Sequence, residues 1–446
     1  MSPLVLFILG VVFVALGIAV SIALHEVGHL VPAKLFGVRV TRYMIGFGPT
    51  LFSRRRGETE YGIKAIPLGG YVAMVGMYPP NVRDGSVRSS STGLFQGLAE
   101  AARDQAHEEV RPEDHGRLFY QLPVWKKTIV MLGGPAMNIL LGIALTAVAL
   151  VGFGLPQPTT QIASVSACMV VEGSPESEAP VDESTCTRTP AAAAGVKPGD
   201  TVVRYDGREV TGWEELTSWI RASAGREVPV TLLRGGAEVT TTVTPVLSER
   251  PVIGSDGQPV TRPDGSYETT EVGFLGIGSR QMLVPEPATA VLPTVGENLR
   301  QVAGVVLNLP ARVVGVAEAA FSTAERDPNG PISVVGVGRV AGEVAALEEV
   351  PIDARVATLF SIVAGVNFAL AVFNLIPLLP LDGGHVAGAL YEGVRRRLAA
   401  WRGRPDPGPF DIAKLLPLTY AVASVLILMS VLLIYADIVK PVKLFG

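Results

Sequence analysis

Residues 4–29 read LVLFILGVVFVALGIAVSIALHEVGH, and this stretch sets the class of the protein. Leu4 to Leu24 carry no charge and are about as long as the roughly 20 residues that a helix needs to cross a bilayer. His25, Glu26 and His29 follow without a break. Because the run has no basic segment before it and no A-x-A-like cleavage site after it, we interpret it as a transmembrane helix and not as a signal peptide.

Three more uncharged runs have a comparable length: Thr128–Phe153, Val356–Leu381 and Leu415–Tyr435. Buried helices of this length in soluble proteins normally carry a polar stripe, and these runs carry none. The sequence therefore predicts a polytopic α-helical membrane protein with four transmembrane helices.

The composition agrees with this class. Of the 446 residues 48% are hydrophobic and 17% are charged, against about 25% charged in soluble proteins. This excludes a disordered chain. The 37 Lys and Arg residues against 41 Asp and Glu residues leave no basic excess, which excludes a nucleic-acid binder of the basic type.

The charges next to the apolar runs predict the orientation in the membrane. Lys and Arg near span ends in short loops face the cytoplasm. The rule applies to two groups of basic residues. Before the second run lie Lys34, Arg39, Arg42, Arg54, Arg55, Arg56, Lys64, Lys126 and Lys127, and before the fourth run lie Arg395, Arg396, Arg397, Arg402 and Arg404. The long segment between the second and third runs carries 26 acidic and 15 basic residues. We therefore expect the protein in the plasma membrane of a bacterium, with this segment, the N-terminus and the C-terminus on the extracytoplasmic side.

The two cysteines, Cys168 and Cys186, both lie in that external segment. A pair confined to the oxidising side of a membrane is a candidate disulfide. Two free, buried thiols are the alternative, because sequence does not give their geometry.

The motif at the end of the first run has the spacing of a metal site. Side chains four residues apart share a helix face, so His25 and His29 can reach one ion. Glu26 can then deprotonate a water whose pKa the metal lowers. Ionisable residues at membrane depth are costly and mark functional sites, so we predict one catalytic Zn²⁺ per chain with Glu26 as the general base.

Catalytic zinc usually takes three protein ligands. The candidate for the third is Asp382, which follows the third run at the end that the topology places at the depth of His25 and His29. Pro377 and Pro380 break the helix there and let the carboxylate turn back into the bundle. His385 is the competing ligand.

Together these motifs resemble the site-2 protease family: HEVGH on the first run, Gly134-Pro135-Ala136-Met137-Asn138 on the second and Leu381-Asp382-Gly383-Gly384-His385 after the third. The pattern is similar to the RseP-type bacterial intramembrane zinc metalloproteases, in particular their actinobacterial branch with one PDZ domain. The resemblance covers nearly the whole chain. It implies His25, His29 and Asp382 as zinc ligands, Glu26 as the catalytic base and Asn374 near the substrate backbone.

Short alternating runs punctuated by Gly and Pro between the first two spans predict β-hairpins, with turns at Gly46, Gly69 and Gly70. A free strand edge beside the zinc can pair with an unwound substrate by β-addition. A purely structural hairpin is the alternative. The resemblance implies a membrane-associated β element here.

The external segment predicts an α+β domain. A GxxPGD turn ending at Asp200 precedes a strand, an amphipathic helix over Trp213–Ala222 and alternating strands over Val228–Val246. The pattern resembles a bacterial PDZ domain, with Gly273, Phe274, Leu275, Gly276 and Ile277 as its peptide-groove strand. The domain would capture peptide C-termini or exclude bulky ectodomains, and the sequence does not separate these two functions from a purely structural one.

These expectations divide the chain into eight parts: 1–36, the first transmembrane helix with HExxH; 37–126, a cytoplasmic-side β region with a polar insertion at 79–114; 127–153, the second transmembrane helix; 154–285, the PDZ domain with its preceding Cys-containing segment; 286–354, external amphipathic helices; 355–390, the third transmembrane helix with LDGGH; 391–413, a basic cytoplasmic loop; and 414–446, the fourth transmembrane helix and the C-terminus.

The sequence thus predicts an intramembrane zinc endopeptidase that cleaves single-pass membrane proteins within the lipid bilayer. The resemblance implies anti-sigma factors, already cut in their ectodomains, as substrates in stress signalling, with residual signal peptides as a second class. The alternatives are a non-proteolytic PDZ membrane receptor or chaperone, and a zinc transporter. No His other than the motif pair lies in any apolar run, which disfavours a transporter.

Overall fold

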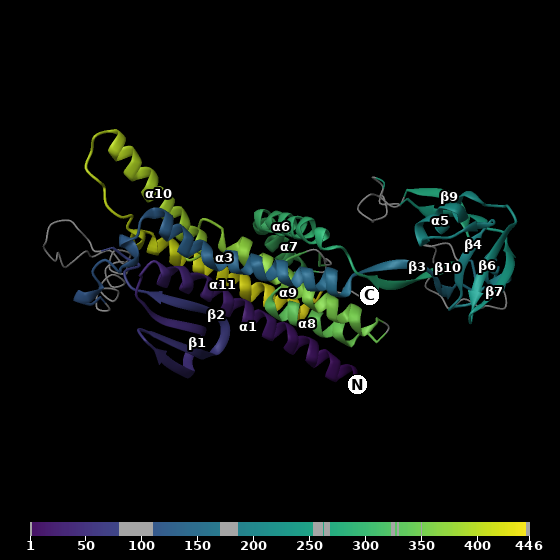
Figure 1. The fold of residues 1–446 in the computed structure, drawn as a ribbon, viewed down its shortest axis with the longest axis horizontal. Coiled ribbons are helices and arrows are strands. Elements are labelled where there is room, and N and C mark those ends of the chain that lie inside the picture. Colours follow the sequence, from purple (N-terminus) through teal and green to yellow (C-terminus); the bar gives the residue numbers. More distant parts are fainter. Residues whose placement is uncertain are drawn as a thin grey trace. The chain divides into compact units, whose positions relative to one another are not determined.

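The computed structural model describes residues 2–79, 110–169, 186–252, 262, 268–322, 326–327, 330–348 and 350–442. The polar insertion predicted at 79–114 lies largely outside these residues. The chain divides into a helical unit, Met1–Gly154 with Pro285–Gly446, and a β unit, Leu155–Val284 (Figure 1). The β unit therefore coincides, within one residue at each end, with the part predicted as a separate domain.

Among the described residues, four helices are long and apolar enough to cross a membrane. They are α1 (Pro3–Leu35), α3 (Val124–Ala147) with its π-helical continuation η3 (Val148–Phe153), α9 (Ile352–Asn374) and α11 (Leu416–Val439). Each overlaps one predicted run. A bent pair, Ala288–Leu307 and Leu309–Phe321, meets at 69° and would count as a fifth span if it crossed as one unit.

Three shorter helices follow the β unit. α6 (Val291–Leu307) buries Val291 and Val295 against Phe368 of α9, and α7 (Leu309–Phe321) packs on Leu433 of α11. α8 (Val334–Ala346) lies along α1, with Ala341 and Val344 in a core shared with Val14. The described part of segment 286–354 thus contains the helices α6, α7 and α8, and α8 packs against α1.

The third predicted span differs from the structure at its C-terminal end. The helix α9 ends at Asn374, and residues 375–381 form turns that contain Pro377 and Pro380. A new helix, α10, runs from Asp382 to Trp401, so the first half of the predicted basic loop 391–413 is helical. The loop prediction relied on charge, although Arg, Leu and Ala are strong helix formers.

The cytoplasmic-side region forms one antiparallel hairpin, β1 (Val40–Arg56) and β2 (Thr59–Met74). Both strands bend, so residues 42–45 pair with residues 60–63 on one side and with residues 70–73 on the other. The hairpin thereby acts as four short strands, in the order 50–56, 59–64, 40–45 and 70–74. In the part of the chain that the structure describes, no further strand pairs with the outer edge of residues 70–74.

The β unit is a twisted sheet with strand order β10-β3-β4-β6-β7, and β5 pairs with β4. The strands are β3 (Leu155–Val165), β4 (Thr201–Tyr205), β5 (Arg208–Glu209), β6 (Val228–Arg234), β7 (Ala237–Val243) and β10 (Ile277–Val284). A separate pair, β8 (Val246–Pro251) and β9 (Thr269–Phe274), completes the unit together with the short helix α4 (Pro190–Ala193).

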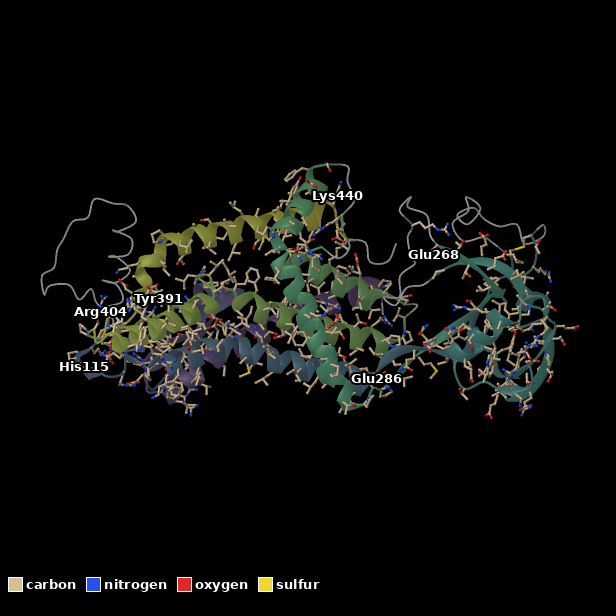
Figure 2. All side chains as sticks on the ribbon, turned by 90° about the horizontal axis from the view of Figure 1, so that it is seen from above. His115, Glu268, Glu286, Tyr391, Arg404 and Lys440 are labelled. Atoms are coloured by element: carbon tan, nitrogen blue, oxygen red, sulfur yellow. A yellow bond between two sulfur atoms is a disulfide. The ribbon has the colours of Figure 1, made fainter. Side chains whose placement is uncertain are left out.

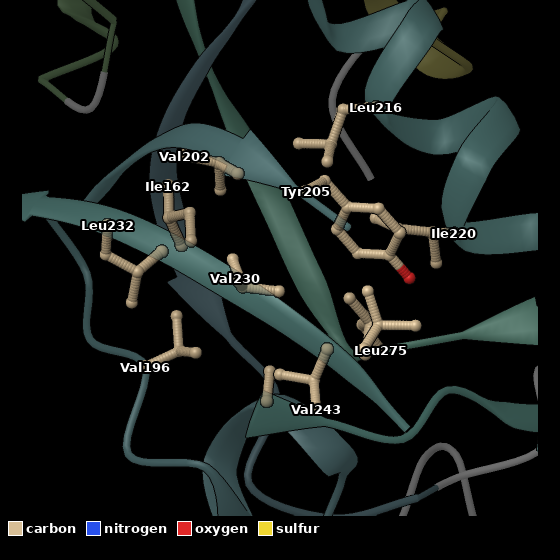
Figure 3. Close-up of a cluster of buried hydrophobic side chains, with 12 residues drawn as sticks. Ile162, Val196, Val202, Tyr205, Leu216, Ile220, Val230, Leu232, Val243 and Leu275 are labelled. Atoms are coloured by element: carbon tan, nitrogen blue, oxygen red, sulfur yellow. The ribbon is translucent and has the colours of Figure 1, made fainter. Parts of the chain in front are cut away.

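Helix α5 (Trp213–Ala222) has the bounds predicted from its amphipathic pattern. Its Leu216 and Ile220 pack on Tyr205, Val230 and Leu232 in the core of the β unit (Figure 3). At the GxxPGD turn, Asp200 accepts hydrogen bonds from Arg234 and from the backbone N–H of Lys197. The Arg234 guanidinium lowers the pKa of the Asp200 carboxyl below its ordinary value, so this ion pair joins the start of β4 to the end of β6 at neutral pH.

Candidate metal centre

The HEVGH motif lies inside α1, which continues unbroken for six residues beyond His29 to Leu35. Helical periodicity puts His25 and His29 on one face. Glu26 and His29 are buried, with 8% and 6% of their surface exposed. In a segment apolar enough to span a membrane, such burial of a carboxylate and an imidazole requires compensating partners.

The compensating group comes from the start of α10. Oδ2 of Asp382 lies 3.2 Å from Nε2 of His25 and 3.4 Å from Nε2 of His29, and the two imidazole nitrogens lie 3.2 Å apart. A metal ion can be held where at least three His, Cys, Asp or Glu side chains bring their donor atoms together. Among the described residues, these three side chains are the one such group. Two imidazoles and a carboxylate form a donor set that catalytic zinc uses, so the residues fit this ion.

The turns after α9 explain how Asp382 reaches the two histidines. Proline at 377 and 380 prevents the helix from continuing, and α10 restarts with Leu381 as its N-cap and Asp382 as its first residue. The chain doubles back closely here, because a Cβ at Gly383 would lie 2.3 Å from the carbonyl oxygen of Ile376. His385, the competing ligand, lies one turn further along α10 and outside the group of converging donors.

Helix α3 supports the site from the other side. Nδ1 of His29 is 2.8 Å from the carbonyl oxygen of Val130, which holds Nε2 toward Asp382. The helices approach closely, since a Cβ at Gly28 would lie 2.2 Å from the carbonyl oxygen of Gly133. The sequence analysis missed this contact, although the adjacent glycines 133 and 134 on an otherwise bulky apolar run are the signal for it.

The hairpin places a strand directly beside the carboxylate of Glu26. A Cβ at Gly70 would lie 2.8 Å from Cγ of Glu26, so only a residue without a side chain fits here. Gly46 and Gly69, with φ of +90° and +98°, lie at the bends of the two strands. The hydroxyl of Tyr43 donates to the carbonyl oxygen of Ala23 and fixes the hairpin to α1. The outer edge of residues 70–74, with which no strand pairs among the described residues, therefore begins next to the side chain of Glu26.

The remaining predicted residues lie in three places. Asn374 is the last residue of α9 and is half-buried. In the β unit, Gly273 and Phe274 end β9, Leu275 is buried, Gly276 turns with φ +83° and Ile277 begins β10. Cys168 and Cys186 form a disulfide, with Cα atoms 5.6 Å apart.

A second buried polar contact was not anticipated from sequence. Nζ of Lys127 on α3 lies 3.0 and 2.8 Å from the carboxylate oxygens of Glu392 on α10. The carboxylate also faces Arg396 at 3.1 Å and accepts the backbone N–H of Phe410. This ion pair ties the helix that carries Asp382 to the helix that supports His29.

Comparisons with known proteins identify a family and several relatives. The model of peptidase family M50 matches residues 13–404. Zinc metalloprotease Rip1 of Mycobacterium tuberculosis is 34% identical over 450 residues, which cover 99% of this chain and 100% of the relative. Rip1 of Mycolicibacterium smegmatis is 34% identical over 455 residues, with the same coverage. Metalloprotease MmpA of Caulobacter vibrioides is 26% identical over 400 residues, 88% of each chain.

Proposed function

Because the chain belongs to peptidase family M50 and is a zinc metalloprotease, we propose that it cleaves single-pass membrane proteins within the bilayer at a site formed by His25, Glu26, His29 and Asp382. The observation that carries this proposal is the convergence of the three donor atoms within 4.8 Å of one another beside a buried glutamate. The alternatives were a non-proteolytic PDZ receptor or chaperone and a zinc transporter. Neither is consistent with the assignment of the chain to a family of metalloproteases.

His25, His29 and Asp382 would hold the zinc ion. Zinc acts as a Lewis acid that polarises a peptide carbonyl and lowers the pKa of water. Glu26 takes a proton from the attacking water and returns it to the leaving amine, as general acid–base catalysis requires. Its burial at 8% exposure keeps bulk water away from this transfer.

The substrate must be extended for cleavage, because helical carbonyls are already hydrogen-bonded. The edge of β2 at residues 70–74 offers unpaired backbone groups that begin beside Glu26. A substrate strand added to this edge would present its peptide bonds to the site. We assign Asn374, with Gly46, Gly69 and Gly70, to substrate positioning on this basis.

Two observations, the charge of the connecting segments and the arrangement of the helical unit, support the proposed topology. His115 and Arg404 lie at one end of this unit, and Glu286 and Lys440 lie at the other (Figure 2). The segments that carry His115 and Arg404 are the ones that the positive-inside rule assigns to the cytoplasm. We therefore propose that the β unit is an extracytoplasmic PDZ domain, joined to the membrane part at its external end.

The β unit would act on substrates before the membrane site does. Its helix α5 and the residues Gly273 to Ile277 form the elements that we assign to a peptide groove. The groove would capture the C-terminus of a substrate already cut in its ectodomain, or the unit would exclude uncut ectodomains. Anti-sigma factors fit this sequence of events, with release of a transcription regulator into the cytoplasm, and residual signal peptides are a second substrate class.

Replacement of Glu26 by Gln tests the catalytic role. We expect cleavage of a membrane-embedded single-pass substrate to fall by at least about 100-fold, the effect of removing a general base, while bound zinc is retained. The measurement is product formation by purified protein in detergent. Undiminished cleavage by the Glu26→Gln variant would refute the assignment.

The ligand set has its own test. Zinc measured by elemental analysis should fall well below one ion per chain in His25→Ala and Asp382→Ala variants. His385→Ala is the matched control, because His385 lies outside the converging group. Full zinc retention without Asp382, together with loss of zinc without His385, would reverse the ligand assignment.

A further inference from the structure

A layer of buried polar side chains lies one helical turn from the candidate metal centre. Ser21 of α1, Asn138 of α3 and Asn367 of α9 have 0%, 1% and 0% of their surface exposed. Nδ2 of Asn367 donates to Oγ of Ser21 and to the carbonyl oxygen of Val363, both at 2.8 Å. Both amide hydrogens of Asn367 are therefore used.

Four polar atoms near this layer have no hydrogen-bond partner among the described residues: Oδ1 and Nδ2 of Asn138, Oδ1 of Asn367 and Nδ1 of His25. A buried polar group without a partner destabilises the folded state, so such groups in native proteins call for an explanation. The four atoms are complementary. Asn138 offers one acceptor and two donors, Asn367 offers an acceptor, and a zinc-bound imidazole offers one N–H donor.

Helix geometry places Asn138 next to His25. Gly134 touches both imidazoles, because a Cβ there would lie 2.4 Å from Nε2 of His29 and 2.6 Å from Cε1 of His25. Asn138 lies four residues later and hence on the same face, about 6 Å along the axis. The two helices run antiparallel, since Val130 contacts His29 and the later Gly134 contacts the earlier His25. The next turn of α3 therefore faces the α1 segment between His25 and Ser21.

The two histidines differ in their outer support. His29 has the carbonyl oxygen of Val130 on Nδ1, and His25 has no partner on Nδ1 among the described residues. Metal-binding histidines almost always donate this second N–H to an acceptor, which fixes the tautomer and the ring orientation. Some acceptor must therefore serve His25.

We propose that Asn138 is this positioning residue. Among the described residues neither polar atom of Asn138 lies within hydrogen-bond distance of a partner, so the relay runs through water. One water accepts the Nδ1–H of His25 and donates to Oδ1 of Asn138, and a second accepts from Nδ2 of Asn138 and donates to Oδ1 of Asn367. The relay holds Nε2 of His25 as the lone-pair donor toward the metal and links it to Ser21 and Asn367. This inference rests on the proposed function of His25 as a zinc ligand and adds the residue that orients it.

Asn138→Leu tests the relay, because leucine has nearly the same shape and no polar atoms. We expect zinc affinity, measured by competition with a chromophoric chelator, to fall about 10-fold or more, within the range found when such outer partners are removed. The absorption spectrum of the Co²⁺ form should shift. Asn138→Asp, which keeps an acceptor, should restore zinc affinity to within about threefold of the unmodified protein.

Two controls separate positioning from stability. Thr146→Val removes another buried polar group of α3 that lies outside the relay, so its zinc affinity should match that of the unmodified protein. If Asn138 were merely buried, Asn138→Leu would unfold at an equal or higher temperature and keep full zinc affinity, which would overturn the proposal. Should the leucine variant fail to fold, Asn138→Ala, which cannot overpack the site, has the same expected loss of zinc affinity.

Loss of zinc affinity in an Asn367→Leu variant, with none in Asn138→Leu, would assign the acceptor to Asn367 and also overturn the proposal. His25→Ala is the reference. If His25→Ala kept its zinc, the ligand set itself would fail. If His25→Ala lost zinc and Asn138→Leu did not, only the positioning role would fail.

Discussion

Gly134 shows how much the candidate metal centre depends on a missing side chain. The space that a Cβ would occupy at this position is filled by the imidazoles of His25 and His29. Gly28 and Gly133 let the backbones of α1 and α3 approach closely at the neighbouring turn. Small residues at such crossings are a general means of packing membrane helices, and here they bring the support of His29 within hydrogen-bond distance.

Gly134→Ala should therefore damage the site. We expect kcat to fall by about 100-fold, since a displacement of about 1 Å in a catalytic group has this effect, and the free energy of unfolding to fall by about 1–3 kcal/mol through overpacking. Cleavage of a membrane-embedded substrate measures kcat, and unfolding in mixed detergent micelles measures the free energy of unfolding.

Gly365→Ala is the matched control. Gly365 also lies inside an apolar helix, and a Cβ there meets no atom within 4 Å. This variant should be unchanged in activity and equally or more stable, because Ala is the better helix former. Equal behaviour of the two variants would contradict the steric argument.

At the level of elements, α10 is held by the buried ion pair of Lys127 and Glu392. The two side chains are 6% and 2% exposed. Glu392 keeps Arg396 and the N–H of Phe410 as further partners, whereas Glu392 is the one anion that Lys127 contacts among the described residues. The two residues are therefore not equivalent, although they belong to one pair.

Glu392→Leu should cost more stability than Lys127→Met. Removal of Glu392 leaves a buried ammonium group without a partner, which typically costs about 3–5 kcal/mol. Removal of Lys127 leaves the carboxylate with two partners, so the loss should be smaller. Unfolding in mixed detergent micelles measures both, and the double variant should recover most of the loss. A larger effect of Lys127→Met would contradict this asymmetry.

The same pair also bears on the site, since α10 begins with Asp382. We expect zinc affinity to fall in Glu392→Leu more than in Lys127→Met, because a displaced α10 moves the carboxylate. This readout separates an effect on the ligand from a general loss of stability.

At the level of the whole molecule, the chain alternates between membrane and water-exposed parts. Its basic and acidic segments, which the proposed orientation puts on opposite sides of the membrane, sum to a net charge of -4. The proposed orientation puts the β unit outside and the basic segment around Arg404 inside. The disulfide, in the β unit, agrees with an oxidising compartment.

Cysteine labelling tests this orientation, because both native cysteines are joined in the disulfide. A membrane-impermeant maleimide should label an Ala237→Cys variant in intact cells. An Arg404→Cys variant should be labelled only after permeabilisation. Both positions are exposed, so accessibility does not confound the result. The reverse pattern would refute the topology.

The sequence by itself determined the features that depend on contiguous residues. Uncharged runs indicated four helices long enough to span a membrane, because transfer into lipid depends on the composition of the segment. The spacing of His25 and His29 put both on one face, because that follows from 3.6 residues per turn. Helix α5 was predicted with its bounds for the same reason.

The tertiary structure alone decided what depends on distant residues. Lys127 and Glu392 are 265 positions apart, and nothing local in either segment indicates the other. The fit of Gly134 against two imidazoles and the burial of Asn138 also arise only when α1 and α3 pack. Sequence left Asp382 and His385 both open as ligands. The turns after α9 bring Asp382 to the two histidines, because side chains on separate helices meet only where the backbone folds them together.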